Sequence, residues 1–593
     1  MTLTTRPTLE GTFGMVSSTH WVASQVGMRL LERGGNAFDA AAAAGFVLHV
    51  VEPHLNGPGG DLPAIIATAA DPTPRVLCGQ GPAPAAATIE HYRSEGLDLV
   101  PGSGPLAAAV PGAVDAWLVL LRDHGSLPLA EVLGPAAHYA RHGHPLLERV
   151  SATVERVADL FTEDWTTSAD LWLDGGRAPR PGSLHRNPAW ADTLDRLVAE
   201  GEAAGADPGA QAEAARRAWS QGFVAEAVDA FSRKPFRDSS GERHAGLVTA
   251  DDLAAFEASW EEPVTLDWRG HTVCKTGPWG QGPALLQSLA VLDALSPDAV
   301  PDPGTADGVH LVAEALKLAF ADREAWYGDT GQVPLDTLLS PAYAAERAGL
   351  VGERASHELR PGSPDGRTPR LAGHALDGSA ARPADPTTGE PTVERTGVTR
   401  GDTCHVDVVD RFGNMVSATP SGGWLQSSPT VPELGFCLGS RLQMTWLEEG
   451  LPSSLIPGRR PRTTLTPTLV LREGRPFMAC GSPGGDQQDQ WQLLFLLRTL
   501  GQGMGLQEAI DAPAWHTTSF PGSFWPRTSE PGVLVVEDRL GADVVDALTR
   551  RGHDVRVEGG WTLGRLCAVT RDEDGVLRAG ANPRGMQGYA VGR

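Results

Sequence analysis

The sequence predicts an α+β fold, and three observations lead to that prediction. Strand and helix patterns alternate near the N-terminus, a helix-rich stretch follows, and a strand-rich block begins at Thr403. Separate helix-rich and sheet-rich blocks are typical of layered α+β proteins. With 593 residues, of which 41% are hydrophobic, the chain is long enough to bury a large core.

The elements before residue 350 follow from local periodicity. Residues 20–33, for example, have helical spacing that ends at the glycine pair 34–35, and an alanine-rich helix begins near Ala37. The expected elements are strands at 14–18 and 265–268, helices at 20–33, from 37 onward, at 113–123, 128–143 and 307–327, and amphipathic helices within 187–292.

Periodicity is lost between about residues 356 and 400, where Pro, Gly, Arg and Asp dominate. An unstructured run of this length is uncommon inside a compact protein. We expect an exposed, mobile connector here, ending just before Thr403.

Regular patterns return at Thr403. The pattern predicts a hairpin formed by residues 404–409 and 415–419 around a turn at 410–414. It predicts a second hairpin formed by residues 466–471 and 476–480. The remaining expected elements are a helix at 488–500, a strand at 533–536, a helix at 542–550, and strands near 555 and at 567–570.

Charge and cysteine usage exclude several classes of protein. The 73 acidic residues outnumber the 49 basic ones, for a net charge of -24, which disfavours nucleic-acid binding. The six cysteines are scattered without a CxxC pair, which argues against a structural zinc site and against a disulfide framework. We expect no metal and no organic cofactor.

The sequence also gives no sign of a membrane association. Its N-terminal stretch has no apolar core of the secretory type, and no segment approaches the ~20 apolar residues that span a bilayer. We therefore expect a cytoplasmic protein.

Thr403 has two interpretations. Threonine is common in strands, so it can simply be the first residue of one. Alternatively, the peptide bond before it is cut, and the new α-amine, with a pKa of about 8, serves as general base for the threonine hydroxyl. No GxSxG motif offers a competing nucleophile.

The glycine-rich segment 481–485 is similarly open to two interpretations. It can be an ordinary turn between a strand and a helix. It can also turn backbone N–H groups toward one point, at the positive end of the following helix, and stabilise an oxyanion.

Several blocks resemble the gamma-glutamyltransferase family, and they occur in the family's order along nearly the whole chain. LLERGGNAFDAAAAA and VVEPHLNGPGGD resemble its GGNAxDAAxA and VxEPxxSGxGGG stretches, and GDTCHVDVVDRFGNMVSAT resembles its nucleophile strand. GRRPRTTLTPTLVL and GSPGGDQQ are similar to its GKRPxSSMSPTxV and GSPGG motifs.

The resemblance implies a precursor that cleaves itself before Thr403. Residues 1–402 would form the large chain, ending in the connector 356–402, and residues 403–593 the small one. The two chains would intertwine in one four-layer αββα sandwich of the N-terminal-nucleophile (Ntn) hydrolase type. Thr403 would be the nucleophile, Ser421 its assisting hydroxyl, and Gly484 and Gly485 the oxyanion donors.

The positions that would bind substrate agree less well with the family. Thr463 and Thr464 replace a serine pair that contacts the substrate carboxylate. Ile89 stands where an arginine is usual, Met444 where the ammonium-binding aspartate is usual, and Arg441 where a glutamine is usual. The arginine that is missing at position 89 would be replaced in its role by Arg93, Arg441, Arg459, Arg460 or Arg462.

Three functions remain open at this point. The resemblance favours a gamma-glutamyl (glutathione-type) amidohydrolase or acyltransferase, which passes the acyl group to water or to an amino-acid or peptide acceptor. The changes at Ile89 and Met444 point to a second possibility, an amidohydrolase that acts on another small acyl amide, such as an oxamate-like one. The third possibility is an uncleaved homologue that only binds a ligand. Whether the chain forms a homo-oligomer also stays open.

A cut one bond later would expose Cys404 as the nucleophile. We interpret Cys404 instead as a small residue that faces the core.

Overall fold

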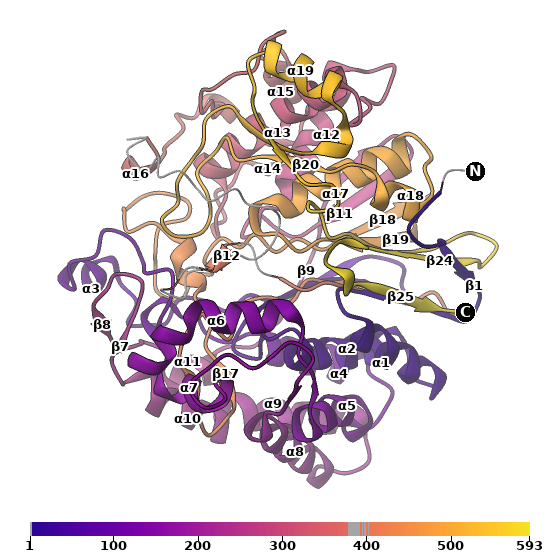
Figure 1. Cartoon of the computed structure of the whole chain (residues 1–593). Coiled ribbons are helices and arrows are strands. Elements are labelled where there is room, and N and C mark those ends of the chain that lie inside the picture. Colours follow the sequence, from indigo (N-terminus) through magenta and orange to yellow (C-terminus); the bar gives the residue numbers. More distant parts are fainter. Residues whose placement is uncertain (1–2, 377–391, 394, 396–398, 401–402) are drawn as a thin grey trace.

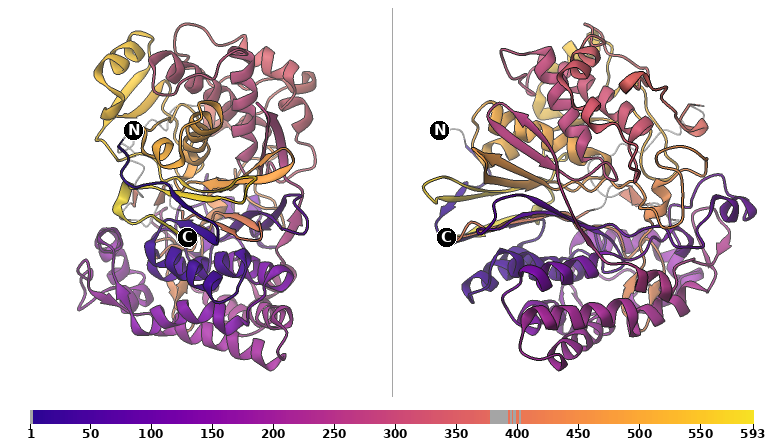
Figure 2. Two further views of the ribbon diagram at one scale, coloured as in Figure 1. Left: turned by 90° about the vertical axis from the view of Figure 1, so that its right-hand side faces the viewer. Right: turned by 180° about the vertical axis from the view of Figure 1, so that it is seen from behind.

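Two seven-stranded antiparallel sheets pack face to face, and helices cover the outer face of each, in the computed structural model of the chain (Figures 1 and 2). The structure describes residues 3–376, 392–393, 395, 399–400 and 403–593. The four layers confirm the α+β prediction and have the αββα order that the resemblance implies.

The first sheet carries the strand that leads into the glycine-rich segment. Its strands lie in the order β1 (Leu9–Gly11), β24 (Leu577–Ala581), β23 (Cys567–Arg571), β19 (Arg475–Gly481), β18 (Thr468–Arg472), β11 (His271–Lys275) and β10 (Val264–Trp268).

The second sheet interleaves strands from both sides of Thr403. Its order is β25 (Tyr589–Gly592), β2 (Gly14–Ser18), β14 (Val406–Asp410), β15 (Met415–Ala418), β3 (Leu62–Ala67), β4 (Arg75–Gly79) and β9 (Ser259–Glu261). β14 is bonded to β2 on one edge and to β15 on the other, so its register is fixed twice.

Helices from the first half of the chain cover the second sheet, and later ones cover the first (Figure 1). On the side of the second sheet lie α1 (Trp21–Glu32), α2 (Ala37–Val51) and α4 (Ala113–His124), which contact its strands, and the outer helices α5 (Leu129–His142), α8 (Pro188–Ala203), α9 (Pro208–Gln221) and α10 (Phe223–Ser232). On the first lie α12 (Gly282–Leu295), α13 (Ala306–Trp326), α15 (Pro341–Ala348), α17 (Gln488–Leu496), α18 (Leu506–Asp511) and α19 (Ala542–Arg550).

The remaining helices and strands complete the fold. They are the helices α3 (Ile89–Ser94), α6 (Glu148–Glu163), α7 (Thr166–Trp172), α11 (Ala250–Ala255), α14 (Leu335–Leu338) and α16 (Gly373–Leu376), the small strand pairs β5 (His144–Pro145) with β6 (Leu184–His185), β7 (Phe236–Arg237) with β8 (Arg243–His244), β12 (Thr392–Val393) with β13 (Thr399–Arg400) and β16 (Thr430–Val431) with β17 (Phe436–Cys437), and the three-stranded sheet of β20 (Trp515–Thr517), β21 (Val533–Glu537) and β22 (Asp554–Glu558).

Alpha-helix α2 is buried along its whole length and has a strong start signal. Asn36 accepts hydrogen bonds from the backbone of Phe38 and Asp39, and the Asp39 carboxylate accepts one from the backbone of Asn36. This reciprocal capping box satisfies two of the free N–H groups that begin every helix. The helix can therefore lie between the second sheet and the outer helices.

Most predicted elements are confirmed, and two segments differ. The helix expected at 488–500 ends as an α-helix at Leu496 and continues as a π turn over Leu497–Gly501. Residues 356–376, predicted as part of an exposed connector, have little regular structure but are held by buried acids: Asp322 accepts from the backbone of Gly362, and Glu314 from that of Ser356. Most of the remaining connector falls outside the described residues.

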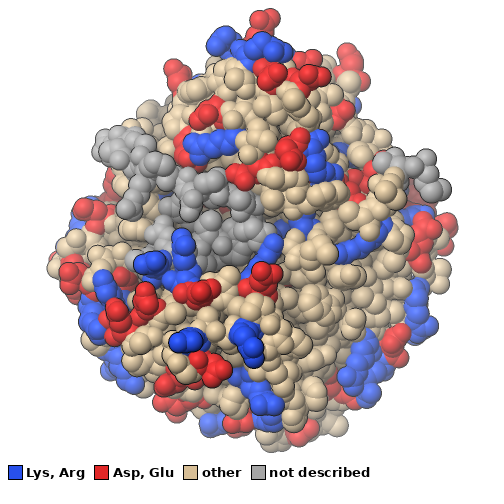
Figure 3. Space-filling model, in the orientation of Figure 1, with Lys and Arg blue, Asp and Glu red and all other residues tan. Residues whose placement is uncertain are grey.

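Acidic and basic side chains are interspersed on the face that Figure 3 shows. None of the described helices is both long and apolar enough to cross a membrane.

The packing of α2 on α4 gives a stability test. A Cβ added to Gly45 would lie 2.2 Å from the Trp117 ring, whereas one added to Gly134 of α5 would meet nothing within 4 Å beyond its chain neighbours. Gly45→Ala is expected to destabilise the fold by about 1–3 kcal/mol through overpacking. Gly134→Ala is the matched control and is expected to change the stability by no more than about 0.5 kcal/mol, because the helix propensity of alanine is offset by contact of its Cβ with Pro135. Denaturant midpoints followed by circular dichroism check both; equal effects would contradict the close α2–α4 contact.

Candidate active site

Thr403 lies between the two sheets because of the alternation of side chains along its strand. Cys404, Val406 and Val408 belong to the apolar core beneath the helices of the second sheet. Val409 belongs to the core between the sheets. Successive strand residues point to opposite faces, so Thr403 faces the gap between the sheets and Cys404 faces the helices.

The Thr403 hydroxyl is buried and has two partners of the right kind for a nucleophile. Its Oγ1 donates to Ser421 Oγ at 3.2 Å and accepts from Gln488 Nε2 at 3.3 Å. Only 1% of the residue is exposed. The structure thus brings together Thr403 and Ser421, which the sequence paired, and adds Gln488, for which the sequence gave no role.

The glycine-rich segment lies beside this hydroxyl, because Gln488 is the first residue of α17. Gly484 and Gly485 have φ of 129° and 56°, in the region that favours glycine. A Cβ on Gly484 would come within 2.3 Å of the Trp491 ring. In the described part of the chain neither glycine N–H has an acceptor. Both amides are thus free to bind a developing oxyanion next to the start of a helix.

Cys404 is unsuited to be the nucleophile. Its Sγ donates to Glu52 Oε2 at 2.9 Å and accepts from Asn56 Nδ2 at 3.0 Å, on the helix side of the sheet. Burial and the Glu52 carboxylate raise the pKa of the thiol well above its usual range. A thiolate is therefore strongly disfavoured there, which supports the interpretation of Cys404 as a residue facing the core.

Arg441 lies against the loop that carries Ser421. Its guanidinium forms a bidentate pair with the Asp61 carboxylate, with both contacts at 2.8 Å, and both residues are buried. The backbones of Asp61 and Ser421 also exchange two hydrogen bonds. Among the described residues the remaining Nη1 reaches only the Sδ of Met444, a weak acceptor, at 3.7 Å.

Two of the positions that depart from the resemblance, Met444 and Ile89, lie in apolar clusters. Met444 is fully buried in a cluster with Trp424 and Phe524. Ile89 packs in another cluster, with Ala83, Tyr92 and others. Neither position holds a charged group that could grip an amino acid.

Thr463 and Thr464 are buried beside the first sheet. The Thr463 backbone N–H donates to the Trp279 carbonyl at 2.9 Å. The Thr464 hydroxyl is buried without a partner in the described part of the structure, so it is available to a ligand. No hydrogen bond joins either threonine to Thr403 among the described residues.

The remaining arginines proposed from the sequence are engaged elsewhere or exposed. Arg93 donates to the Leu447 carbonyl, and Arg460 pairs with Glu261 and Asp329. Arg459 is exposed. Arg462 is buried and pairs with Glu324 at 3.0 Å.

Arg462 belongs to a buried charged cluster that sequence reasoning missed. Arg323, Arg462 and Arg527 surround two carboxylates, those of Glu324 and Asp486, and Asp486 directly follows Gly485. Burial alone would raise the pKa of Glu324, but the three arginines hold it at about 2. With three cations and two anions, this cluster carries excess positive charge next to the glycine-rich segment. Its members are far apart in sequence, so only the fold reveals it.

A second missed feature lies on the strand of Thr403. The His405 ring bonds Thr419 Oγ1 at 2.9 Å and Asp407 Oδ1 at 2.8 Å, and all three residues are buried. These residues share the Thr403 face of the strand. The alternation from Thr403 could have indicated them.

The described residues include one group of side chains close enough to share a metal ion, His310, Glu314 and His553, with ligand atoms within 4.8 Å of one another. Glu314 is already paired with Lys317 and with Arg360, the latter at 3.1 Å. Those two cations would repel a metal ion, so we assign none.

Comparison with known proteins agrees with this geometry. A family model described as gamma-glutamyltranspeptidase matches residues 23–592. The chain is 32% identical to the glutathione hydrolase-like YwrD proenzyme of Bacillus subtilis (strain 168), over 98% of this chain and 99% of that protein. It is 31% identical to the oxamate amidohydrolase proenzyme of Klebsiella pneumoniae subsp. pneumoniae, over 98% of each.

Solved structures show the same relationship. The structure of LmbA2991HD is 62% identical to this chain, with a TM-score of 0.95 over 100% of both. That of a cephalosporin acylase from Bacillus halodurans is 29% identical, with a TM-score of 0.82 over 100% of this chain and 97% of that one. The chain therefore belongs to the gamma-glutamyltranspeptidase family of Ntn hydrolases.

Proposed function

We propose that the protein is a self-processing threonine amidohydrolase that cleaves a small acyl amide carrying a carboxylate. The chemistry rests on the Thr403 hydroxyl, which is buried between Ser421 and Gln488. It lies beside the N–H groups of two glycines that have no acceptor among the described residues. Such donors stabilise the tetrahedral intermediate of acyl transfer.

Processing would use the same groups. The Thr403 Oγ attacks the carbonyl carbon of the preceding peptide bond, and the acyl group moves from nitrogen to oxygen. Water then hydrolyses the ester and leaves a free α-amine on Thr403. Both curated relatives compared above are named as proenzymes, which supports this step.

In the mature site the new amine would act as general base. It takes the proton from Oγ as Oγ attacks the substrate amide, and it passes that proton to the departing amine. Gly484 and Gly485 would donate to the oxyanion, and Ser421 would hold the hydroxyl and amine in place. Water, or an amino-acid or peptide amine, then takes the acyl group from Thr403.

The surroundings of Met444 favour an acyl group without the glutamyl ammonium. Met444, Trp424 and Phe524 form an apolar surface where the resemblance calls for a carboxylate. Asp61, whose backbone is bonded to that of Ser421, is neutralised by Arg441. A buried ammonium would be left unpaired there, at a high desolvation cost.

A carboxylate on the acyl group would find donors nearby. Arg441 Nη1 faces only a thioether among the described residues, Thr464 has a free hydroxyl, and the three-arginine cluster has a surplus cation. The likeness to an oxamate amidohydrolase is in keeping with this chemistry. Gamma-glutamyl amides, suggested by the glutathione hydrolase-like relative, are the alternative that the experiments below separate.

The first prediction concerns processing. The purified chain is expected to give two bands on a denaturing gel, the smaller beginning at Thr403 by N-terminal sequencing. Thr403→Ala is expected to stay full length, because it removes the nucleophile. Cys404→Ala is the matched control and should still be cut at the same bond. A full-length band that persists in the unaltered protein, or a small chain that begins at Cys404, would contradict the assignment.

The second prediction concerns the acyl group. Glutaryl-p-nitroanilide differs from gamma-glutamyl-p-nitroanilide only by lacking the α-ammonium. The cleaved enzyme is expected to prefer the glutaryl compound or oxamate, with kcat/KM at least about tenfold higher than for the gamma-glutamyl compound, equivalent to ~1.4 kcal/mol. Release of p-nitroaniline and of ammonia measures this, with and without glycylglycine as acceptor. A preference for the gamma-glutamyl compound would restore the alternative substrate and leave the nucleophile unaffected.

The third prediction separates the two substrate-facing residues. Arg441→Gln is expected to lower kcat/KM for the carboxylate substrate by about ten- to hundredfold, since hydrogen bonds to charged groups contribute ~1.5–3 kcal/mol. Met444→Asp is expected to shift preference toward the gamma-glutamyl compound by supplying a partner for its ammonium. Thermal denaturation checks that both variants are folded, because removing Arg441 leaves the buried Asp61 carboxylate without its partner. Unchanged preference in both would exclude these residues from the substrate pocket.

A further inference from the structure

The first turn of α17, which begins with Gln488, is polar although it is buried. Four of the first five side chains of this helix are polar, and each is 0% exposed: Gln488, Asp489, Gln490 and Gln492. Buried side chains are usually apolar, because polar ones must be matched by specific partners. The partners of these four therefore show to what the turn is fastened.

The amides of this turn bond two different parts of the fold. Gln488 Nε2 donates to the Thr403 hydroxyl at 3.3 Å. Gln490 exchanges two hydrogen bonds with the backbone of Thr517 on β20, through Nε2 at 3.0 Å and through Oε1 at 2.8 Å. The turn is thus bonded to the nucleophile at one point and to the sheet of β20 at another.

Asp489 fastens the turn to the first sheet through a buried ion pair. Its Oδ1 lies 3.0 Å from Nζ of Lys275, the last residue of β11, and neither side chain is exposed. Lys275 Nζ also donates to Thr468 Oγ1 at 2.7 Å and to the Thr466 carbonyl at 3.1 Å. Thr466 Oγ1 in turn donates to Asp489 Oδ1 at 2.8 Å. The carboxylate lies in the first turn of the helix, where the helix dipole favours negative charge.

Stability alone does not account for this ion pair. Taking a lysine and a carboxylate out of water costs several kcal/mol for each ion, and a well-packed apolar pair of similar volume is often at least as stable. An apolar pair would lack direction, however. The charge-assisted bonds of Lys275 hold the Asp489 carboxylate, and with it the first turn of α17, in one place.

The same turn sets the direction of an oxyanion donor. The Gly484 carbonyl accepts from the backbone N–H of Gln487 at 3.0 Å. The Gly485 carbonyl accepts from the backbone N–H of Gln488 and from Gln281 Nε2, the latter at 3.4 Å. In a trans peptide the N–H points opposite to the carbonyl with which it shares a plane. The Gly485 N–H therefore points away from Gln487, and a shift of this turn would redirect it.

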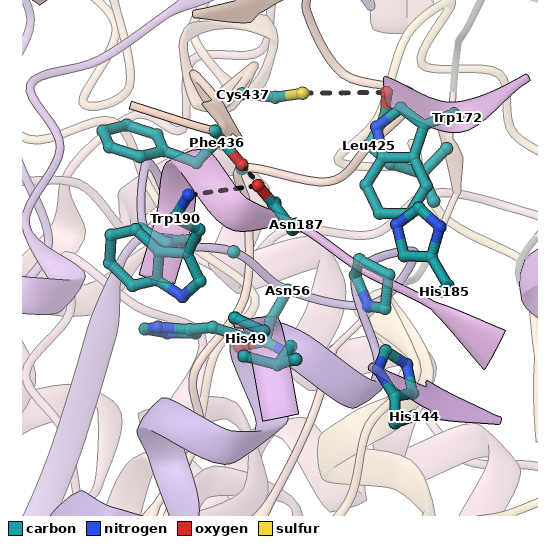
Figure 4. A pocket seen from close by; sticks show the side chains of 17 residues that line it. His49, Asn56, His144, Trp172, His185, Asn187, Trp190, Leu425, Phe436 and Cys437 are labelled. Carbon is teal, nitrogen blue, oxygen red and sulfur yellow. Dashed lines mark hydrogen bonds between the residues drawn. The ribbon is translucent and has the colours of Figure 1, made fainter. Parts of the chain in front are cut away.

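The cavity that Figure 4 shows supplies no anchor of this kind. It lies on the helix side of the catalytic strand, beside Asn56, which bonds Cys404 Sγ. Its volume of about 30 Å³ has room for only one or two water molecules. The described residues that line it include no Lys, Arg, Asp or Glu. This cavity therefore cannot hold the reacting groups by charge, whereas the ion pair at α17 can.

We propose that Lys275 and Asp489 are positioning residues for the reaction of Thr403. Their ion pair fixes the first turn of α17. This turn holds the Gln488 amide on the nucleophile and directs the Gly485 N–H at the developing oxyanion. The inference rests on the proposed function. Since the oxyanion forms in the transition state and not in the bound substrate, the pair raises kcat and leaves KM unchanged.

The test removes both charges at once, so that neither is left buried and unpaired. The double variant Lys275→Met with Asp489→Asn keeps the approximate length and shape of the two side chains. It is expected to lower kcat by about ten- to hundredfold, with KM within about twofold, because a displaced oxyanion donor costs less than a deleted one. The substrate is whichever of glutaryl- and gamma-glutamyl-p-nitroanilide the parent hydrolyses faster. Self-cleavage before Thr403, followed on a denaturing gel after cell-free synthesis, is expected to slow by a similar factor.

The pair of Lys317 with Glu314 on α13 provides the matched control, because it too joins a buried lysine to a buried carboxylate. Lys317→Met with Glu314→Gln is expected to leave kcat and self-cleavage as in the parent. Thr466→Val is a milder second variant, which keeps the shape of the side chain but removes the hydroxyl bonded to Asp489. Its kcat is expected to fall in the same direction but less. Thermal denaturation checks that each variant is folded.

Hydrogen exchange followed by mass spectrometry measures the placement of the turn without any substrate. Peptides that cover residues 481–496 are expected to exchange faster in the variant of Lys275 and Asp489 than in the parent or in the control. A parent that stays full length and hydrolyses neither amide would refute the proposed function, and the exchange comparison would still decide the positioning.

The positioning role is overturned if the folded double variant exchanges, cleaves itself and turns over substrate as the parent does. It is also overturned if the loss lies in KM and not in kcat, or if the control variant loses as much activity.

Discussion

The register of β14 is the constraint on which the whole site depends. Because side chains alternate, one register places the Thr403 hydroxyl against Gln488 and Ser421 and the Cys404 thiol against Glu52 and Asn56. A slip by one residue would exchange the two faces. Bonding to β2 and β15 on both edges prevents it. In the proposed reaction, strand pairing therefore selects the threonine over the cysteine, because it sets the surroundings of each side chain.

The buried charges around the site form two groups. Asp61 and Arg441 neutralise each other directly behind Ser421, while the cluster of three arginines and two carboxylates does not reach neutrality. Buried charges are retained only where they are paired or used. The fold thus holds one neutral pair beside the Ser421 loop and one cluster with a surplus cation.

Much of the fold could be predicted from local patterns. The strands around residues 14–18, 264–268 and 468–481 and the helices α1, α4, α5 and α13 follow from periodicity, caps and glycine breaks. Thr403, Ser421 and the two glycines came from motifs in a known order, and the structure places them at one point. Asp61, Gln488 and the cluster of Arg323, Glu324 and Asp486 could not be predicted, because their proximity depends on pairing between distant segments. The packing of residues 356–376 was missed for the same reason: buried acids on α13, and not local periodicity, hold that stretch in place.

The interleaving of the second sheet has a consequence for the life of a cleaved molecule. β14 lies between β2 from the start of the chain and β15, and β15 in turn lies beside β3. In two polypeptides woven in this order, the β2–β14 and β15–β3 ladders would each join one chain to the other, so dilution could not part them without melting the sheet itself. They would behave as one body with a fixed one-to-one stoichiometry, and folding would have to precede the cut. Of fragments synthesised apart, the first would lack the central strands β14 and β15 and the second would lack their neighbours β2 and β3, and each would expose unpaired edges that invite aggregation.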